Sequence, residues 1–356
     1  MILAVESSCD ETAVAVLDPS AVNLSDSLKS NIISSQVEAH APYGGVVPEL
    51  AARKHITNLP VVVNESLKQA GVSFEDLTAV AVTRGPGLKV CLLVGITWAR
   101  TLAFGLGVPL IAVNHLEGHL LAHELEPEGS EAVFPRLILL VSGGHTMLIL
   151  SPSRGVYQTV AETQDDAAGE AFDKSAMLLG LGYPGGPALS KLAAEGDTSR
   201  FSFPIGMPNN DQKFSFSGMK TAVWREIENQ DLSSEQIVKD LAAGVELAIV
   251  DALELKTRAA LKKYSPKSLI LAGGVAANGR LRQRFKCLGD EFDSRFYVAR
   301  PAFCTDNAAM IAVAANYHYQ KHKSEMECWK INAEQAGPGL ELDFSPLNRW
   351  PLAAEA

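Results

Sequence analysis

The segment from His115 to His123 holds three of the eight histidines of the chain. On an α-helix, side chains four positions apart lie on one face, so His115 and His119 would be neighbours. Two imidazoles placed in this way can bind one transition-metal ion. The alternative interpretation is a pair of solvated histidines on a helix surface. The spacing therefore indicates a candidate metal site and requires a helix at this point of the chain.

The residue after the first histidine separates this segment from the zinc-peptidase motif. That motif, His-Glu-x-x-His, places its general base directly after the first histidine. Leu116 occupies this position here, and Glu117 would lie about 200° around the helix from His115. The sequence thus offers a metal site without the usual peptidase base.

Size and composition limit the class of protein. A chain of 356 residues, 47% hydrophobic and 20% charged, suggests two lobes or one large domain with a full core. We expect no membrane span, since no apolar run approaches ~18 residues. We also expect no signal peptide, since the N-terminal residues include no basic region and too few apolar residues. The net charge of −10 argues against a general nucleic-acid coat but permits a local basic groove. Five scattered cysteines without a CxxC pair predict reduced thiols and a cytoplasmic location.

The two halves of the chain show elements in the same order. Residues 2–6 and 12–17 are predicted as two strands around a polar turn, and residues 137–141 and 146–150 repeat that unit. Further short apolar runs then alternate with helical patterns in both halves, which favours α/β lobes. The repeated order predicts a duplication with pseudo-twofold symmetry, although residue identity between the halves is low.

We expect an N-terminal lobe over residues 1–132, a C-terminal lobe over 133–322 and a loosely ordered tail over 323–356. Two lobes facing across a cleft would bring Asp306, which follows the last strand of the second lobe, opposite the histidines. An insertion at 200–230 interleaves phenylalanines with cations. It is either a loop packing its own aromatic side chains or a nucleic-acid contact through stacking and charge.

Three glycine-containing turns in the second lobe are candidates for nucleotide binding. The turn 142–145 lies between two strands and can offer backbone N–H groups to an anion, although most such turns are ordinary hairpins. Gly273 and Gly274 end a strand and precede a helix for which Asn278 would be the N-cap. The turn 182–187 follows a helix with an acidic patch, which is either a solvated helix start or a site for ribose or a cation.

Together these motifs closely resemble those of the bacterial tRNA N6-adenosine threonylcarbamoyltransferases, a family formerly described as O-sialoglycoprotein endopeptidases. The resemblance includes VESSCDETAVAVLD at 5–18, the histidine pair, the glycine turns and the segment 213–223, and extends over roughly residues 2–315. It implies an α/β fold of the two-lobed type shared by actin, heat-shock ATPases and sugar kinases. Such a fold has duplicated ribonuclease-H-like lobes and a central cleft.

The resemblance also implies site residues. It makes His115, His119 and Asp306 the ligands of one divalent metal ion, with Fe(2+) usual and Zn(2+) possible. The substrate- and nucleotide-binding positions that it implies are Val141, Ser142, Gly143, Gly144, His145, Asp173, Gly186, Ser190 and Asn278. The strand-ending turn adds Gly273 and Gly274 as candidates. The chain departs from the family pattern twice. Leu140 replaces a tyrosine ligand of archaeal and eukaryotic relatives, and Ser190 replaces an aspartate of many relatives.

The implied reaction transfers a threonylcarbamoyl group from threonylcarbamoyl-AMP to N6 of the adenosine next to the anticodon, in tRNAs reading codons that start with A, and releases AMP. Because the donor is a mixed anhydride, no protein nucleophile is required, and a metal ion can act as Lewis acid. Asp10 and Glu11 are candidates to accept the amine proton. Ser7 or Ser8 as a nucleophile is an open alternative.

The resemblance implies a paralogous subunit of the same fold and a small ATPase as partners, besides tRNA. An acidic chain is poorly suited to bind a polyanion unaided. Its clustered cations are Arg53 and Lys54; Lys213, Lys220 and Arg225; and Arg280, Arg282, Arg284 and Lys286. Apolar faces on the helices expected at 48–70 and 90–106 favour a partner surface there. The alternative functions are a metallopeptidase, or an ATPase or sugar kinase of the same fold.

Overall fold

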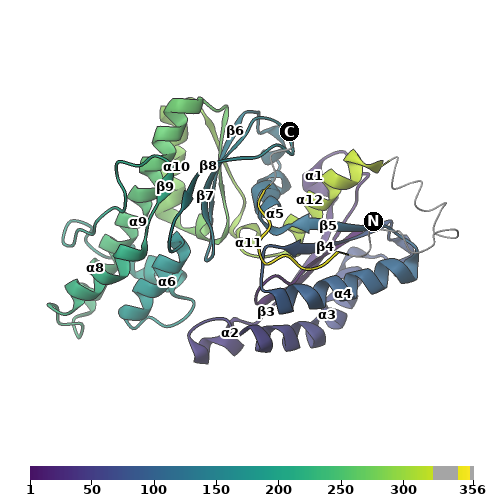
Figure 1. The fold of residues 1–356 in the computed structure, drawn as a ribbon, viewed down its shortest axis with the longest axis horizontal. Helices are drawn as coiled ribbons and strands as arrows, with labels where there is room; N and C mark the ends of the chain where they lie inside the picture. The colour runs from purple at the N-terminus through teal and green to yellow at the C-terminus, as the bar shows by residue number, and fades with distance from the viewer. Residues whose placement is uncertain (324–343, 353–356) are drawn as a thin grey trace. The chain divides into compact units, whose positions relative to one another are not determined.

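The computed structural model describes residues 1–323 and 344–352 (Figure 1), so most of the expected loosely ordered tail lies outside the described residues. The chain divides into two compact units. Of the described residues, unit 1 contains Met1–Ser130 together with 305–323 and 344–352, and unit 2 contains Glu131–Cys304. The predicted C-terminal boundary of the second lobe, residue 322, is therefore wrong, because unit 2 ends at Cys304. Helix α12 (Ala308–Lys321) packs against β1, β2 and β5 of unit 1.

The sheet of unit 1 has the strand order β3-β2-β1-β4-β5. Its strands are β1 (Ile2–Glu6), β2 (Glu11–Leu17), β3 (Leu28–Ser35), β4 (Ala79–Gly85) and β5 (Leu110–Asn114). Strands β1, β2 and β3 pair antiparallel, whereas β1, β4 and β5 pair parallel. All five residues of β1 are buried, as expected for a strand whose two faces are both covered.

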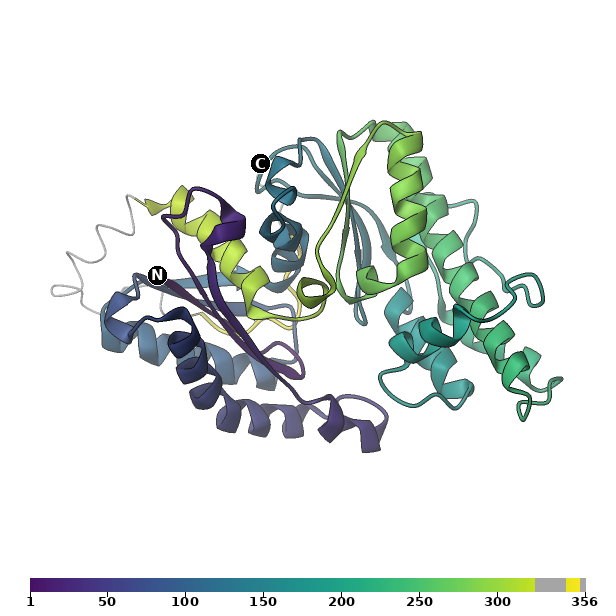
Figure 2. The same ribbon diagram turned by 180° about the vertical axis from the view of Figure 1, so that it is seen from behind.

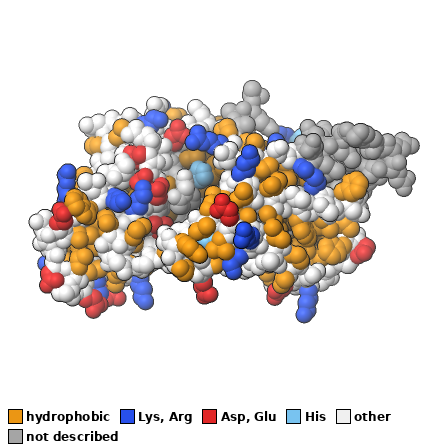
Figure 3. Space-filling model, turned by 60° about the horizontal axis from the view of Figure 1, so that its bottom comes forward, with side chains coloured by type: hydrophobic (Ala, Val, Ile, Leu, Met, Phe, Trp, Pro, Cys, Tyr) orange, Lys and Arg blue, Asp and Glu red, His pale blue; other side chains and the backbone are white. Residues whose placement is uncertain are grey.

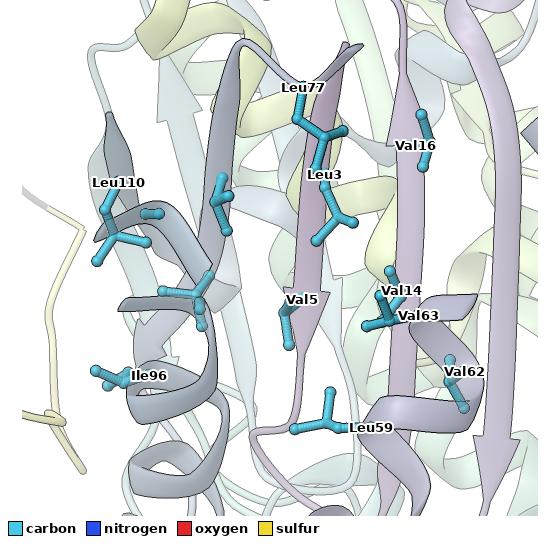
Figure 4. Close-up of a cluster of buried hydrophobic side chains, with 14 of the residues drawn as sticks. Leu3, Val5, Val14, Val16, Leu59, Val62, Val63, Leu77, Ile96 and Leu110 are labelled. Atoms are coloured by element: carbon cyan, nitrogen blue, oxygen red, sulfur yellow. The ribbon is translucent and has the colours of Figure 1, made fainter. Parts of the chain in front are cut away.

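Helices cover both faces of this sheet (Figure 2). The helices of unit 1 are α1 (Leu24–Ser27), α2 (Val37–His40), α3 (Pro48–Ala70), α4 (Lys89–Leu106), α5 (His115–Leu121) and α12. Alternate side chains of the central strands point to opposite faces, so Leu3 and Val5 pack with Leu59 of α3 and Ile96 of α4 in one core (Figure 4). Helices α5 and α12 pack against each other.

The sheet of unit 2 repeats this pairing pattern and adds one strand, in the order β11-β10-β6-β7-β8-β9. Its strands are β6 (Arg136–Val141), β7 (Thr146–Ser151), β8 (Gln158–Thr163), β9 (Lys213–Phe214), β10 (Ser268–Ala272) and β11 (Arg295–Val298). Strands β6, β7 and β8 pair antiparallel, and β6, β10 and β11 pair parallel. In sequence order, β6, β7, β8, β10 and β11 therefore correspond to β1, β2, β3, β4 and β5. The predicted duplication is confirmed at the level of topology. The extra strand β9 comes from the expected insertion and pairs with β8.

Two long helices pack together over the unit 2 sheet. These are α9 (Glu235–Tyr264) and α10 (Gly279–Glu291). The remaining helices are α6 (Ala168–Leu178), α7 (Gly185–Ala193), α8 (Ser217–Ile227) and α11 (Pro301–Cys304). Helix α6 packs against α7 and α8, so the helices that follow the first hairpin of this unit form one contiguous layer.

Helix α4 is an exception to the expectation that no segment is apolar and long enough to span a membrane. Among the described residues it is the one helix whose length and composition would allow it to cross a membrane. It packs against β4 and α3 through Leu92, Ile96 and Ala99, as a core helix of a globular unit does. Only a third of its residues are buried, so much apolar surface is left on its outer side.

Candidate metal centre and nucleotide-binding loops

The predicted histidine helix is present as α5, directly after β5. Asn114 begins it as N-cap, since its Oδ1 accepts a hydrogen bond from the backbone N–H of Leu116 at 2.9 Å. The rings of His115 and His119 are buried with centroids 4.8 Å apart. His123 lies beyond the helix, in the 3-10 turn Ala122–Leu125, with Nδ1 2.9 Å from the Leu120 carbonyl oxygen. The pair, without the third histidine, forms the candidate site.

Asp306 meets this pair within unit 1. Its Oδ1 lies 3.1 Å from His119 Nε2 and 3.5 Å from His115 Nε2. Asp306 reaches the histidines because α12 packs closely on α5. This packing depends on Gly118, since a Cβ at this position would lie 3.0 Å from Ile311 Cδ1 and 3.2 Å from Met310 Cγ. The expected trio is therefore brought together, but inside one unit and not by residues of two lobes.

The trio fits a divalent metal ion. Ligands about 2.1 Å from a tetrahedral ion lie roughly 3.4 Å from one another, close to the separations observed from the aspartate oxygen to both imidazole nitrogens. Two imidazoles and one carboxylate, with positions left for water or substrate, are a donor set for Fe(2+) or Zn(2+). His119 Nδ1 is buried and has no hydrogen-bond partner in the described part of the chain.

Glu6 contacts the candidate metal site and could not be identified from its local sequence spacing. Its Oε2 lies 3.0 Å from His115 Nδ1 and accepts a hydrogen bond from Thr83 Oγ1 at 2.6 Å. A carboxylate on Nδ1 leaves Nε2 of His115 free to face the metal position. Burial opposes ionisation, but His115 outweighs it and lowers the pKa of Glu6. A carboxylate in the otherwise apolar strand β1 was the available signal.

The same contacts argue against two alternative roles. Ser8 Oγ lies 3.2 Å from His115 Nδ1, the nitrogen that Glu6 also contacts, whereas a catalytic triad needs serine and carboxylate on opposite nitrogens. Ser7 Oγ donates to the Cys91 carbonyl oxygen. Glu117 points away from the histidines, as the helical geometry predicts, and its Oε2 lies 2.8 Å from His318 Nε2.

Asp10 ends the turn that follows β1, and Glu11 is the first residue of β2. Burial, together with the negative charges of Asp306 and Asp10, raises the pKa of Glu11 to about 9. Glu11 is therefore protonated at neutral pH in the metal-free chain. A bound dication would favour its ionised form, which is the form able to accept a proton.

In unit 2, the turn after β6 leaves two glycines open. Ser142 N donates to the His145 carbonyl oxygen at 2.8 Å, and His145 N donates to Ser142 Oγ at 3.1 Å. Gly143 and Gly144 are exposed, and a Cβ on either would meet nothing within 4 Å. Within the described residues no packing requires these glycines, whereas a ligand lying on the backbone would.

The other expected nucleotide-binding residues form two contacts in the same unit. Asp173 Oδ1 accepts hydrogen bonds from the N–H groups of Gly185 and Gly186 at 3.0 and 2.9 Å and so caps α7. Burial raises the pKa of Asp173. Asn278 caps α10 as predicted, and its Nδ2 donates to Ser190 Oγ at 2.8 Å.

Glu246 of α9 is a second residue missed from the sequence. Its two carboxylate oxygens accept from Asn278 Nδ2 at 2.6 Å and from Arg280 Nε at 2.7 Å. It is 4% exposed. Nothing in its local sequence distinguishes it from other helix glutamates, because its partners lie more than 30 residues away.

The insertion does not present its phenylalanines to solvent. All four are at most 8% exposed, namely Phe201, Phe203, Phe214 and Phe216. Asp165 anchors the segment, since Oδ1 accepts from the backbone N–H of Phe216 at 2.7 Å and Oδ2 accepts from Ser215 Oγ at 2.6 Å. Of the two interpretations of these phenylalanines, the loop packing its own aromatic side chains is correct.

Most of the basic group after Asn278 is already occupied. Arg280 pairs with Glu246, and Arg284 pairs with Asp251 and Glu254. Arg282 donates to the carbonyl oxygens of Ala276 and Ala299. In α8, by contrast, Lys220 and Arg225 are exposed beside Trp224, which is 49% exposed. An aromatic side chain between cations is therefore available on α8.

Comparison of the whole fold finds solved structures of the same fold. A nucleotide-bound HypF structure matches with a TM-score of 0.58 and 13% identity, covering 90% of this chain and 55% of that one. The ADPNP-bound activator of 2-hydroxyisocaproyl-CoA dehydratase from Clostridium difficile matches with a TM-score of 0.51 and 13% identity, covering 91% and 97%. At these identities the likeness concerns the fold, and it confirms the predicted fold class.

Sequence comparison identifies the family. A family model described as tRNA N6-adenosine threonylcarbamoyltransferase matches residues 27–313. Proteins of that name from Desulfitobacterium hafniense (strain Y51) and Geotalea daltonii are 47% and 43% identical to this chain. The alignments cover 96% and 99% of this chain and 97% and 98% of the relatives. As its motifs predicted, the chain belongs to the family of tRNA N6-adenosine threonylcarbamoyltransferases.

Proposed function

We propose that the protein transfers a threonylcarbamoyl group from threonylcarbamoyl-AMP to N6 of the adenosine beside the anticodon, in tRNAs reading codons that start with A. The proposed site of action is the cytoplasm. His115, His119 and Asp306 would hold one divalent metal ion, Fe(2+) or Zn(2+). The observation that carries the proposal is the convergence of this trio in a chain of this transferase family.

In the proposed reaction the adenosine amine attacks the carbonyl carbon of the mixed anhydride. A C–N bond forms, the bond from that carbon to the phosphate oxygen breaks, and AMP leaves with the electron pair. The amine loses one proton, for which Asp10 and Glu11 are the proposed acceptors. The metal ion supplies Lewis-acid polarisation when bound. Glu6 contributes by fixing the ring of His115.

The loops of unit 2 are the proposed binding site of the adenylate. The open backbone at Gly143 and Gly144 suits a phosphate, because N–H groups without side chains can approach an anion closely. The contact between Ser190 and Asn278 offers a hydroxyl and an amide for ribose. Ser190 keeps a polar but uncharged group at a position where many relatives carry an aspartate.

A reconstituted reaction tests this function against the peptidase alternative. The chain, its partner subunits, tRNA and threonylcarbamoyl-AMP should give threonylcarbamoyladenosine in tRNA digests analysed by mass spectrometry. The metal-loaded chain should leave glycoprotein substrates uncut, because Leu116 occupies the place of the peptidase base and Glu117 pairs with His318. Cleavage that disappears in His115→Ala would contradict the proposal, and ATP consumption without tRNA product would favour the ATPase alternative.

The proposed partner surface is the outer side of α3 and α4. These helices enclose an apolar groove of about 530 Å³ lined by residues that include Ile56, Leu93 and Trp98. Ile56 and Leu93 are 61% and 52% exposed, and Figure 3 shows hydrophobic side chains over this face of unit 1. We propose that the groove binds the paralogous subunit, which would bury the apolar surface of α4.

Leu93→Glu is expected to weaken binding of the paralogous subunit by at least about 30-fold, the size of an interface hot spot of ~2 kcal/mol. Titration of the two purified subunits by calorimetry measures this. Val61→Glu is the matched control, because Val61 is 63% exposed on α3 but does not line the groove. If both variants bound the paralogous subunit with equal affinity, that subunit would bind elsewhere. If Leu93→Glu altered the self-association of this chain, the groove would bind a second copy of the chain.

tRNA contact is proposed for the exposed face of α8. Lys220, Trp224 and Arg225 combine charge for phosphates with an aromatic ring for base stacking. With a net charge of −10 and the arginines of α10 paired internally, the isolated chain should bind tRNA weakly. The partner subunits would supply the remaining contacts.

A further inference from the structure

The C-terminal segment 344–352 (yellow in Figure 1), here called the strap, is bound along unit 1. Leu347 N donates to the Arg84 carbonyl oxygen at 2.8 Å, and Arg84 Nε donates to the Ser345 carbonyl oxygen at 3.2 Å. The Arg84 guanidinium lies over the Phe344 and Trp350 rings, 5.1 and 5.4 Å from their centroids. The strap is thus fixed by backbone and side-chain contacts at the end of β4.

The surface beneath the strap is shaped to receive it. Gly85 has φ +154°, and a side chain there would collide with the Leu347 carbonyl group. Arg100 of α4 donates through Nη2 to the Phe344 carbonyl oxygen at 2.6 Å. Phe344 is partly buried and packs against the hydrophobic core of unit 1. These contacts indicate a built seat for the strap.

The strap ends on the residue that starts the metal-bearing helix. Asn114 Nδ2 donates to the Trp350 carbonyl oxygen at 3.1 Å, while Oδ1 of the same side chain caps Leu116 N at 2.9 Å. One amide therefore joins the strap to the first turn of α5. The helix has only seven residues, too few to be stable by itself, so its position depends on its cap and its packing.

We propose that the strap is a positioning element for the metal centre: by holding Asn114 it sets the first turn of α5 and with it the direction of the His115 ring. The inference rests on the proposed metal site. His115 follows Asn114 directly, so rotation of the cap residue moves the imidazole relative to Asp306. Glu6 orients the ring from the side of β1, and the strap orients the backbone that carries it.

The test compares two truncated chains with the full chain. Ending the chain after residue 343 removes the strap, and ending it after residue 352 is the matched control. Zn(2+) affinity is measured by competition with a chromophoric chelator. Removal of the strap is expected to weaken it 10–100-fold, the usual effect of losing a partner of a metal ligand, and the control should bind as the full chain does.

Asn114→Asp separates the two functions of this residue, since aspartate still caps Leu116 but cannot donate to Trp350. It should reproduce the loss of affinity, although the added negative charge by itself would favour a cation. Unchanged affinity in both Asn114→Asp and the chain ending at 343 would overturn the proposal.

Hydrogen exchange of the metal-free chains decides the same point without metal. Removal of the strap should speed exchange of the α5 amides about tenfold while α3 keeps its protection. Unchanged exchange in α5 would also overturn the proposal. A full chain whose Zn(2+) affinity is insensitive to His119→Ala would instead refute the metal site, leaving the exchange result to judge the strap.

Discussion

His119→Ala is expected to lose the metal ion while the fold is retained. A centre with three protein ligands loses one third of its donors, and the effect should exceed the 10–100-fold typical of substitutions around the ligands. The buried His119 ring contacts Asp306 and lies outside the hydrophobic core cluster of unit 1, so the substitution leaves that core intact. Elemental analysis after dialysis measures the metal, and circular dichroism checks the fold.

His123→Gln is the control for this substitution. His123 belongs to the same sequence motif but lies in the following 3-10 turn, so metal content and transferase activity should stay close to normal. The combination of His115→Ala, His119→Ala and Asp306→Ala should bind no metal. Full metal content in that triple variant would show that the ligand assignment is wrong.

Two adjacent glycines of unit 2 should respond differently to substitution. Gly273 has φ +88°, and a side chain there would collide with the Val141 carbonyl group, because β10 and β6 end side by side. Gly273→Ala should therefore lower the free energy of unfolding by ~1–3 kcal/mol. Urea denaturation measures this value.

Gly274 has no left-handed backbone conformation and is half-buried at the start of a 3-10 turn. Gly274→Val should keep the unfolding midpoint but abolish adenylate binding in calorimetry, since bulk over the backbone blocks a flat ligand. Normal binding by this variant would show that the turn is structural. Normal stability of Gly273→Ala would contradict the steric argument.

Elements with strong local signals were predictable from the sequence. Strand β1 has the expected bounds, and β6 and β7 differ from theirs by one residue, because buried apolar runs are a local property of the sequence. Asn278 was predictable as an N-cap for the same reason. The histidine pair of α5 could be placed on one helix face once a helix was assumed.

Contacts between distant segments were not predictable. Glu6 and His115 lie 109 positions apart, and no local spacing connects them. Phenylalanines alternating with cations look alike in a packed loop and in a nucleic-acid contact, and only the burial of Phe214 and Phe216 separates the two. The return of Asp306 to unit 1 depends on the packing of α12, which a duplicated strand order does not reveal.

The discontinuity of unit 1 has a consequence for biosynthesis. Its first piece ends at Ser130 and its second begins at Thr305, so the ribosome makes all of unit 2 between them. At 5–20 residues per second, roughly 10–35 s pass before α12 emerges. Until then, the face of the unit 1 sheet that α12 covers is bare and Asp306 does not exist. The nascent chain can complete the fold of unit 2 first, and the metal centre can form only at the end of translation.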